Sequence, residues 1–363
     1  MKIAMLSNAA VVHTVRWVEH FRRRGHLVRL WSLEDGPAAL GADRLPRLPL
    51  PGLLRYPLAA HALRRALAAF GPDLVIAHFV PNYGVLGVLS GRHPLVVAAW
   101  GSDLRVSGRR DALQRARARW VLGRADLVLA DSENLAAAAR DLGAAAGTVV
   151  ALPWGIDLER FRPGDAREPG LLLSTRMHEP IYDLPALIEA ARPVLDQHPA
   201  ARLVIAGDGR QRRSLERLAA RRLPAGRYTF VGLLSPGDLA GWLGRAGIYL
   251  SAARSDSTSV SLLEAMACGA IPVVCDLEGN REWVAEGEGA RLFRAGDAAD
   301  ATRAIQLALG DPAWAAGARA RNRREVEARA DWTANMARVE SLFESLVAHR
   351  GPAPRAAAGE DAR

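Results

Sequence analysis

Short apolar runs, each about the length of one β-strand, recur along the chain with helix-compatible stretches between them. They occupy residues 2–6, 26–33, 73–79, 95–100 and 126–132 in the first half, and 171–176, 201–209, 228–234, 247–253 and 270–276 in the second. Strands that are apolar throughout are typical of a parallel sheet covered by helices on both faces. The pattern predicts an α/β fold with two Rossmann-like, doubly wound domains in series.

A stretch rich in Pro and Gly, residues 149–170, separates the two series. We therefore expect an N-terminal domain over residues 1–155 and a C-terminal domain over residues 156–331, facing each other across a central cleft. The helical pattern at 332–349 follows the last repeat, so this helix is expected to pack back across the interface. The composition of residues 350–363 is typical of a disordered tail.

The composition is that of a soluble globular protein, with 50% hydrophobic and 24% charged residues. The apolar runs are too short to span a membrane, and the start of the chain carries no cleavage-site pattern. Cys268 and Cys275 are the only cysteines, which is too few for a disulfide framework. We therefore expect a protein of the reducing cytoplasm.

The basic excess lies entirely in the first half. Residues 1–150 contain 20 Lys and Arg against 11 Asp and Glu, whereas residues 151–363 contain 28 of each. Such a surface could face phosphate groups, nucleic acid or the inner face of an anionic membrane. The mixed apolar and basic stretch 48–70 fits either an interfacial helix or a helix packed on its own sheet.

The most informative loop is the stretch SDSTSVSLLEAMACGAIPVV, which begins at Ser255. Its hydroxyl-rich turn leads directly into a helix, whose free N–H groups and dipole would attract a phosphate. Glu264 follows within that helix, where its carboxylate could accept hydrogen bonds from sugar hydroxyls. An alternative is that the serines only cap the helix and Glu264 is a solvated surface residue.

Taken with other motifs, this stretch resembles the retaining glycosyltransferases of family 4, which belong to the group 1 glycosyltransferases and have the GT-B fold. Asp256 and Glu264 match the paired acids of that family. The other matching pieces, in chain order, are RRRGHLV, WGSDL, ADSENL, PWGIDLERFRP, VIAGDG, FVGLL and GNREWV. The resemblance extends from about residue 1 to residue 345.

The resemblance implies transfer of a sugar from a nucleotide-sugar donor to a glycan, lipid-linked or small-molecule acceptor. It implies that Glu264 holds the donor ribose, that Asp256 is the catalytic acid beside the donor sugar, and that Arg176 binds the diphosphate. Guanidinium and N–H groups would stabilise the departing diphosphate without a cofactor or metal, and the chain has no Asp-x-Asp pair. The other donor-binding residues implied are Gly207, Asp208, Val231, Ser257, Thr258, Ser259 and Val260.

Three positions depart from the family pattern. The first acid is Asp256 rather than Glu, one methylene shorter, and the usual lysine after the arginine is Tyr182. The usual histidine before Gly-Ser-Asp is Trp100, which presents an apolar wall instead of a base. These departures bear on the donor and on how it is held.

In the first domain, the sequence SNAAVVHTVRW replaces the glycine-rich loop of the family. We expect Asn8, His13 and Arg16 to lie on the acceptor or donor-sugar side, together with Trp100 and Asp103. Alternative interpretations are that His13 caps or packs at a helix end and that Asp103 is a helix cap.

Other functions compete with a glycosyltransferase. A phosphorylase would need a lysine for pyridoxal phosphate, and Lys2 is the only lysine. A nucleotide-sugar epimerase of the same architecture and a non-catalytic nucleotide or nucleic-acid binding protein remain as alternatives. No nucleic-acid-binding motif supports the latter, so we expect no nucleic-acid partner.

Overall fold

The computed structural model describes residues 1–46, 56–101, 104 and 112–349. The chain forms two compact units, which are described separately. The first comprises Met1–Leu152 together with the chain from Ala337 onward, and the second comprises Pro153–Met336. The expected disordered tail at 350–363 lies outside the described residues.

The first unit contains a parallel sheet of seven strands in the order β3-β2-β1-β4-β5-β6-β7. All of its pairs are parallel, as continuous apolar strands predict. The strands are β1 (Lys2–Leu6), β2 (Leu27–Ser32), β3 (Asp43–Arg44), β4 (Leu74–His78), β5 (Leu95–Ala99), β6 (Leu127–Ala130) and β7 (Val149–Ala151).

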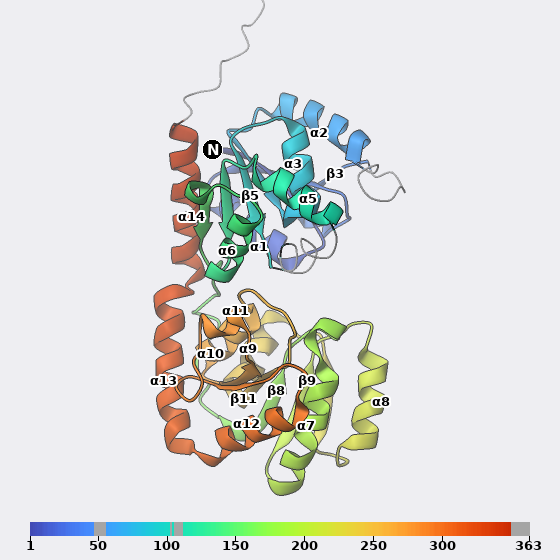
Figure 1. The fold of residues 1–363 in the computed structure, drawn as a ribbon, viewed down its shortest axis with the longest axis vertical. Coiled ribbons are helices and arrows are strands. Elements are labelled where there is room, and N and C mark those ends of the chain that lie inside the picture. Colours follow the sequence, from blue (N-terminus) through green and yellow to red (C-terminus); the bar gives the residue numbers. More distant parts are fainter. Residues whose placement is uncertain (47–55, 102–103, 105–111, 350–363) are drawn as a thin grey trace, which may run out of the picture. The chain divides into compact units, whose positions relative to one another are not determined.

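Helices lie on both faces of this sheet (Figure 1). They are α1 (Val12–Arg23), α2 (Tyr56–Phe70), α3 (Gly84–Ser90), α5 (Ala112–Leu122) and α6 (Glu133–Asp141), with short 3₁₀ turns at Ala38–Leu40 and Ala146–Thr148. Helix α2 buries Tyr56, Leu63 and Leu67 in the core. The described part of stretch 48–70 is thus a helix packed on its own sheet, while residues 47–55 lie outside the described residues.

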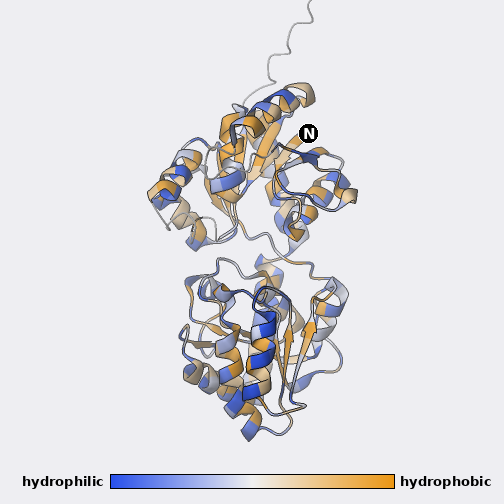
Figure 2. Ribbon diagram, turned by 90° about the vertical axis from the view of Figure 1, so that its right-hand side faces the viewer, coloured by the Kyte–Doolittle hydropathy of each residue, from blue (hydrophilic) through white to orange (hydrophobic). Residues whose placement is uncertain are grey.

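The second unit repeats the plan with six parallel strands in the order β10-β9-β8-β11-β12-β13. The strands are β8 (Glu168–Ser174), β9 (Arg202–Ala206), β10 (Tyr228–Gly232), β11 (Ala246–Ser251), β12 (Ile271–Cys275) and β13 (Arg291–Phe293). Figure 2 shows apolar strands bordered by helices that carry both polar and apolar residues. The two Rossmann-like sheets confirm the predicted α/β fold class.

Two layers of helices cover the second sheet. One core packs α7 (Leu184–Gln197), α8 (Arg212–Arg222) and α12 (Ala298–Gly310) on one face. The other packs α9 (Pro236–Arg245) and α10 (Val260–Cys268) on the opposite face, with Val326 of α13 (Pro312–Arg329). The remaining helices are the 3₁₀ turn Pro180–Tyr182, α11 (Glu278–Arg281), α13 (Pro312–Arg329) and α14 (Trp332–Ala348).

From Ala337 onward, α14 belongs to the first unit, where an ion-pair cluster anchors it. Glu340 Oε1 lies 2.7 Å from His26 Nε2, and Glu340 Oε2 accepts a hydrogen bond from Arg24 Nε at 3.0 Å. The ring of Phe343 stacks on that of Phe21, with centroids 5.5 Å apart. These contacts fix α14 to α1 and to the start of β2.

Three short strands were not predicted, namely β3, β7 and β13. They have only two or three residues each, and none carries a long apolar run, so pairing with a neighbour rather than composition defines them. Strand β7 and the start of β8 both lie within the stretch 149–170, which was expected only to separate the domains. Within the described part of the chain, no helix is both long and apolar enough to cross a bilayer.

Candidate active site

The predicted donor-site residues of the second unit lie where its strand order changes direction. Strands β8 and β11 are neighbours in the sheet. After β8 the chain continues toward β9 on one side, and after β11 it continues toward β12 on the other, so the two loops diverge at the carboxyl ends of these strands. In open parallel sheets this switch point is where ligands bind. Arg176 follows β8, and Asp256 follows β11.

Arg176 is the centre of the site. Its Nη1 donates hydrogen bonds to Ser259 Oγ and Ser261 Oγ, each at 2.7 Å. Its Nη2 donates to Asp256 Oδ2, also at 2.7 Å. The ring of Tyr182 lies over the guanidinium, with its centroid 4.1 Å from Cζ. A buried cation is thus held by two hydroxyls, one carboxylate and one aromatic face.

Helix α10 supplies the hydroxyls and begins at this point. Ser259 is its N-cap, and its Oγ accepts a hydrogen bond from Leu262 N. The Oγ of Ser261 lies 2.7 Å from the hydroxyl of Tyr249, a fully buried residue of β11. The first N–H groups of a helix have no intrahelical acceptor, and the first turn of α10 contains no acidic residue. The positive end of the helix therefore lies beside Arg176.

The electrostatics of the site keep Arg176 protonated. Burial alone would lower the pKa of Arg176, but the Asp256 carboxylate, with Tyr249 and Tyr182, outweighs burial and raises the pKa above its ordinary value. Three buried polar atoms near the end of β8 have no hydrogen-bond partner in the described structure, namely Ser174 Oγ, Thr175 Oγ1 and Arg176 Nε. Unsatisfied buried polar atoms are rare, and water or a ligand would satisfy them.

Glycines bring the loop after β9 against the Arg176 loop. Gly207 has φ +108°, and a Cβ on it would lie 2.6 Å from the carbonyl oxygen of Arg176. Only glycine combines this conformation with so close an approach. Gly207 N also donates to Gly232 O at 2.7 Å, which ties this loop to the end of β10, where Val231 lies. The neighbouring Asp208 accepts a hydrogen bond from Gly209 N through Oδ1.

The remaining residues predicted to bind the donor lie on the same loop and helix. Ser257 and Thr258 are buried in the loop before α10, and Val260 is the first residue of the helix. Glu264 is half-buried, just over one turn from Ser259. The structure thus brings Arg176, Asp256 and Ser259 into direct contact, with Glu264 further along the same helix.

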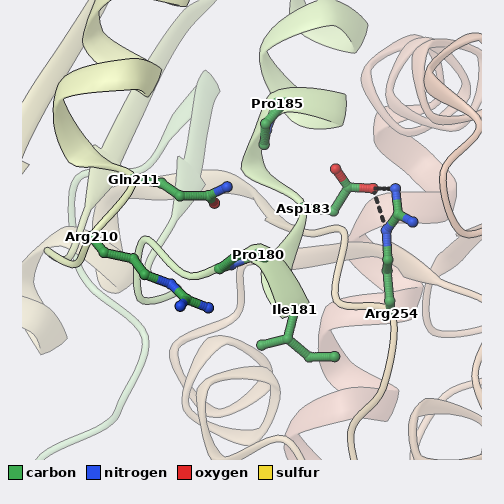
Figure 3. A pocket seen from close by; sticks show the side chains of 7 residues that line it. All are labelled: Pro180, Ile181, Asp183, Pro185, Arg210, Gln211 and Arg254. Carbon is green, nitrogen blue, oxygen red and sulfur yellow. Dashed lines mark hydrogen bonds and ion pairs between the residues drawn. The ribbon is translucent and has the colours of Figure 1, made fainter.

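A cavity of about 570 Å³ lies in the second unit (Figure 3). It is lined by Pro180, Ile181, Asp183, Pro185, Arg210, Gln211 and Arg254. Asp183 Oδ2 accepts hydrogen bonds from Arg254 Nε and Nη2 at 2.9 and 2.7 Å, which links the loop of Arg176 to the loop of Asp256. None of the predicted site residues lines this cavity.

In the first unit, the predicted residues that the structure describes lie after β1, on α1 and after β5. The His13 ring lies 5.1 Å from the Trp100 ring, and the Phe79 ring lies 5.8 Å from the same indole, measured between centroids. The N-cap of α1 is Val11, so the interpretation of His13 as the helix cap is wrong and it packs on Trp100 instead. Asp103 lies outside the described residues.

The neighbours of this aromatic cluster are polar, and of them His78 is fully buried. Asn8 Oδ1 accepts a hydrogen bond from Ala10 N at 2.9 Å, which shapes the turn after β1. Arg16 lies one turn after His13 on α1 and, after burial itself, is the second cause that lowers the pKa of His13 to about 4. Burial, followed by the nearby His13, lowers the pKa of His78 to about 3. Both imidazoles are therefore neutral at pH 7.

The backbone at the end of β4 is unusual. Phe79 has φ +66°, a left-handed conformation that is rare outside glycine. It begins a π-helical turn, Phe79–Tyr83, and such turns often occur at functional sites. The residue with this backbone conformation is the one whose ring stacks on Trp100.

Several residues at the two clusters were not predicted to be functional. The sequence marks Tyr182 only as the place of a missing lysine, and Tyr249 lies inside an apolar run. Ser261 belongs to the hydroxyl-rich stretch but had no expected role. His78 lies 3.2 Å from Ser7 Oγ through Nδ1 and is hidden in the strand run 73–79. A polar residue inside an otherwise apolar strand was the available signal for Tyr249 and His78.

Metal-ligating side chains do not converge in the part of the chain that the structure describes. No group of three or more His, Cys, Asp or Glu side chains there is arranged to hold a metal ion. Both cysteines are free and buried, and burial raises the pKa of each thiol to about 12.

Two Rossmann-like units, with a buried arginine beside the start of a helix at the carboxyl edge of the second sheet, are the features of the GT-B class of glycosyltransferases. Family models match both units. The model "Glycosyl transferases group 1" matches residues 156–330, and "Glycosyltransferase Family 4" matches residues 10–160. The chain belongs to the group 1 glycosyltransferases of family 4 type, as the sequence motifs predicted.

Curated relatives support this assignment. The chain is 30% identical over 247 residues to D-inositol 3-phosphate glycosyltransferase 2 of Catenulispora acidiphila, covering 62% of this chain and 58% of that protein. It is 29% identical over 187 residues to a phosphatidyl-myo-inositol mannosyltransferase of Propionibacterium freudenreichii, covering 51% and 45%. The matches thus span about half the length of these relatives.

Solved structures share the fold over nearly the whole chain. HepE of Anabaena in complex with UDP superimposes with a TM-score of 0.80 at 17% identity, covering 95% of this chain and all of that one. Sucrose-phosphate synthase of Thermosynechococcus elongatus gives 0.81 at 22% identity, covering 96% of this chain and all of that one. HepE has also been solved with UDP-glucose.

Proposed function

We propose that this protein is a retaining glycosyltransferase that moves a sugar from a nucleotide-sugar donor to an acceptor hydroxyl. The observation that carries the proposal is the fixed guanidinium of Arg176 beside the start of α10. Its Nη1 is held by Ser259 and Ser261, and its buried Nε has no partner in the described structure. This arrangement favours an anion with several oxygens, such as a diphosphate.

Each donor-site residue has a role in this proposal. Arg176 and the backbone N–H groups near Ser259 and Val260 hold the diphosphate, and Glu264 accepts hydrogen bonds from the ribose. Asp256 lies beside the donor sugar during transfer. Ser257 and Thr258 shape the diphosphate loop, and the base lies near Gly207, Asp208 and Val231.

The roles of Arg176 and α10 follow from the negative charge that develops on the leaving diphosphate. In the transfer, the bond between the anomeric carbon and the diphosphate oxygen breaks, and a bond to the acceptor oxygen forms as that hydroxyl gives its proton to the departing diphosphate. Negative charge grows on the phosphate oxygens as they leave. Prepositioned donors are most effective when they face developing charge, and removing one costs about 10²–10³ in rate. Arg176 and the α10 N–H groups meet this requirement without a metal.

Acceptor recognition is assigned to the first unit. The rings of His13, Phe79 and Trp100 form an apolar surface, and aromatic rings pack well against the C–H faces of sugars. Asn8 and Arg16 add polar groups beside it. We propose a glycan, lipid-linked or small-molecule acceptor and a cytoplasmic location. We also propose contact with the membrane surface through the basic first unit.

Nucleotide binding is the first test. Because HepE binds UDP and UDP-glucose, UDP and its sugars are the first ligands to try, followed by GDP, ADP and their sugars. A ligand that binds only the folded protein raises its Tm. The donor that raises Tm is then incubated with and without acceptors, and the anomeric configuration of the product is read by proton NMR.

The outcomes separate the candidate functions. Transfer with a retained anomeric configuration supports the proposal, and an inverted product contradicts the retaining mechanism. Conversion of the donor sugar without any acceptor would favour an epimerase. Absence of nucleotide binding together with absence of transfer from every nucleotide sugar would overturn the proposal.

A further inference from the structure

The guanidinium of Arg176 is fixed more firmly than the carboxylate that neutralises it. Both hydrogens of Nη1 are engaged by Ser259 and Ser261, and Ser261 is itself held by Tyr249. The ring of Tyr182 covers one face. The Arg176 side chain is 8% exposed, whereas that of Asp256 is 19% exposed. A ligand that competes for this ion pair would therefore move the acid and not the arginine.

The mobility of Asp256 is confined to its side chain. The residue lies in neither a helix nor a strand. Its backbone, however, is packed tightly, because a Cβ on Gly279 would lie 2.9 Å from Asp256 O and 2.0 Å from Ser257 O. Rotation about the side-chain bonds is thus the movement that this loop permits.

Asp256 also accepts only part of the hydrogen bonds that the Arg176 guanidinium can donate. The Nε and Nη2 edge of a guanidinium matches two oxygens of a carboxylate or phosphate at once. In this structure Asp256 accepts from Nη2 through one oxygen, and Nε has no hydrogen-bond partner among the described residues. A phosphate group placed on this edge would engage both N–H groups.

We propose that Asp256 is a displaceable counter-ion of Arg176, an inference that rests on the proposed function. In the free protein its carboxylate occupies the place of a donor phosphate oxygen. The incoming diphosphate takes over the Nε and Nη2 edge, and the released carboxylate turns toward the donor sugar. The acid is thereby delivered to the sugar only when a diphosphate is present.

This exchange predicts that loss of an active-site charge lowers the Kd for a nucleoside diphosphate instead of raising it. If Asp256 competes with the diphosphate, removal of its charge strengthens binding of a nucleoside diphosphate while it weakens transfer. If Asp256 instead serves only to anchor Arg176, its removal weakens binding, because the guanidinium loses its position. The two possibilities are separated by the direction of one change in Kd.

The experiment is isothermal titration of the full chain with UDP, GDP or ADP, whichever binds best, and with the matching free nucleoside. We expect Asp256→Asn and Asp256→Ala to bind the diphosphate about 3- to 30-fold more tightly than wild type, as loss of a competing charge pair allows. The free nucleoside should bind unchanged. Asp256→Glu keeps the charge and should remain within about threefold of wild type.

Glu168→Gln is the matched control. Glu168 pairs with Arg202 and Arg245 at the amino end of β8, the opposite edge of the same sheet, and its loss should leave diphosphate binding unchanged. Unchanged or weaker diphosphate binding by both Asp256 variants would overturn the inference, and so would an equal gain for the free nucleoside. If wild type itself binds no nucleotide and transfers no sugar, the proposed function fails before this question arises.

Discussion

The ring of Tyr182 lies 4.1 Å from the guanidinium carbon of Arg176, on the face of a group whose edges are engaged by Asp256, Ser259 and Ser261. The resemblance placed a lysine at this position in related chains. A tyrosine adds no charge there, but it orients the arginine.

Replacing Tyr182 tests this orientation. We expect Tyr182→Ala to raise the KM for the nucleotide-sugar donor about 3- to 30-fold, because a partly desolvated cation–π contact contributes about 0.5–2 kcal/mol. Tyr182→Phe retains the ring and serves as the control. Initial-rate kinetics over a range of donor concentrations measure the effect. An equal loss in both variants would show that the hydroxyl, not the ring, is what matters.

Gly207 tests the close approach of the two loops. A Cβ at this position would lie 2.6 Å from the carbonyl oxygen of Arg176, so Gly207→Ala must displace the backbone that carries the arginine. We expect a loss of about 2–4 kcal/mol in the free energy of unfolding of the second domain and weaker diphosphate binding.

Gly226→Ala is the matched control for this substitution. Gly226 also has a positive φ, +75°, but a Cβ added there would have no atom within 4 Å. It should lose only about 1 kcal/mol, the cost of the left-handed backbone. Urea unfolding of both variants gives the comparison, and equal losses would mean that the steric contact at Gly207 has no effect.

The buried histidines predict a pH dependence of stability. Burial lowers the pKa of His13 to about 4 and that of His78 to about 3, whereas both titrate near 6.5 in the unfolded chain. Between pH 6.5 and 4 only the unfolded chain takes up these protons, so the stability of the first domain falls as pH falls. The loss is on the order of several kcal/mol at pH 4.

Thermal unfolding between pH 7 and pH 4.5 measures this effect. His78→Gln should have a lower Tm than wild type at pH 7, because a buried ring is lost, but a smaller decrease in Tm on acidification. A decrease as steep as that of wild type would contradict the role of His78.

Glu340 tests the attachment of α14 to the first unit. Burial would raise the pKa of this carboxyl, but its hydrogen bonds with His26 and Arg24 outweigh burial and hold the pKa below its ordinary value. Glu340→Ala leaves Nε2 of the buried His26 imidazole without its partner. We expect a loss of about 2–4 kcal/mol and faster hydrogen exchange in α14. Arg338→Ala, on the same helix, is the control, and unchanged exchange in Glu340→Ala would contradict the anchoring role.

Much of the fold could be predicted from local patterns. The run KIAML became β1, and the helical pattern at 332–349 became α14 at Trp332–Ala348. In each of these segments, the spacing of the apolar residues and the length of the segment indicate the same element, a strand in the first and a helix in the second. Strands β3, β7 and β13 could not be predicted, because two or three residues acquire strand geometry only from a neighbouring strand.

The candidate site was predicted in part. Arg176, Asp256 and Ser259 were chosen from motifs, and the structure brings them into contact. The contact between the acid and the arginine was not expected, because the motif gives each a separate role and residues 80 positions apart carry no local signal of pairing. For the same reason, Tyr249 and Tyr182 were not recognised as supports of this arginine.

The sequence by itself determined the two parallel sheets, the helix that Ser259 caps and the family of the chain, because apolar period, capping residues and motif spacing are local properties. Tertiary structure decided how the cation is held. Arg176, Tyr182, Tyr249 and Asp256 meet only because β8 and β11 are neighbours in the sheet. Which hydrogen bonds a guanidinium makes depends on distances and angles that only the folded chain specifies.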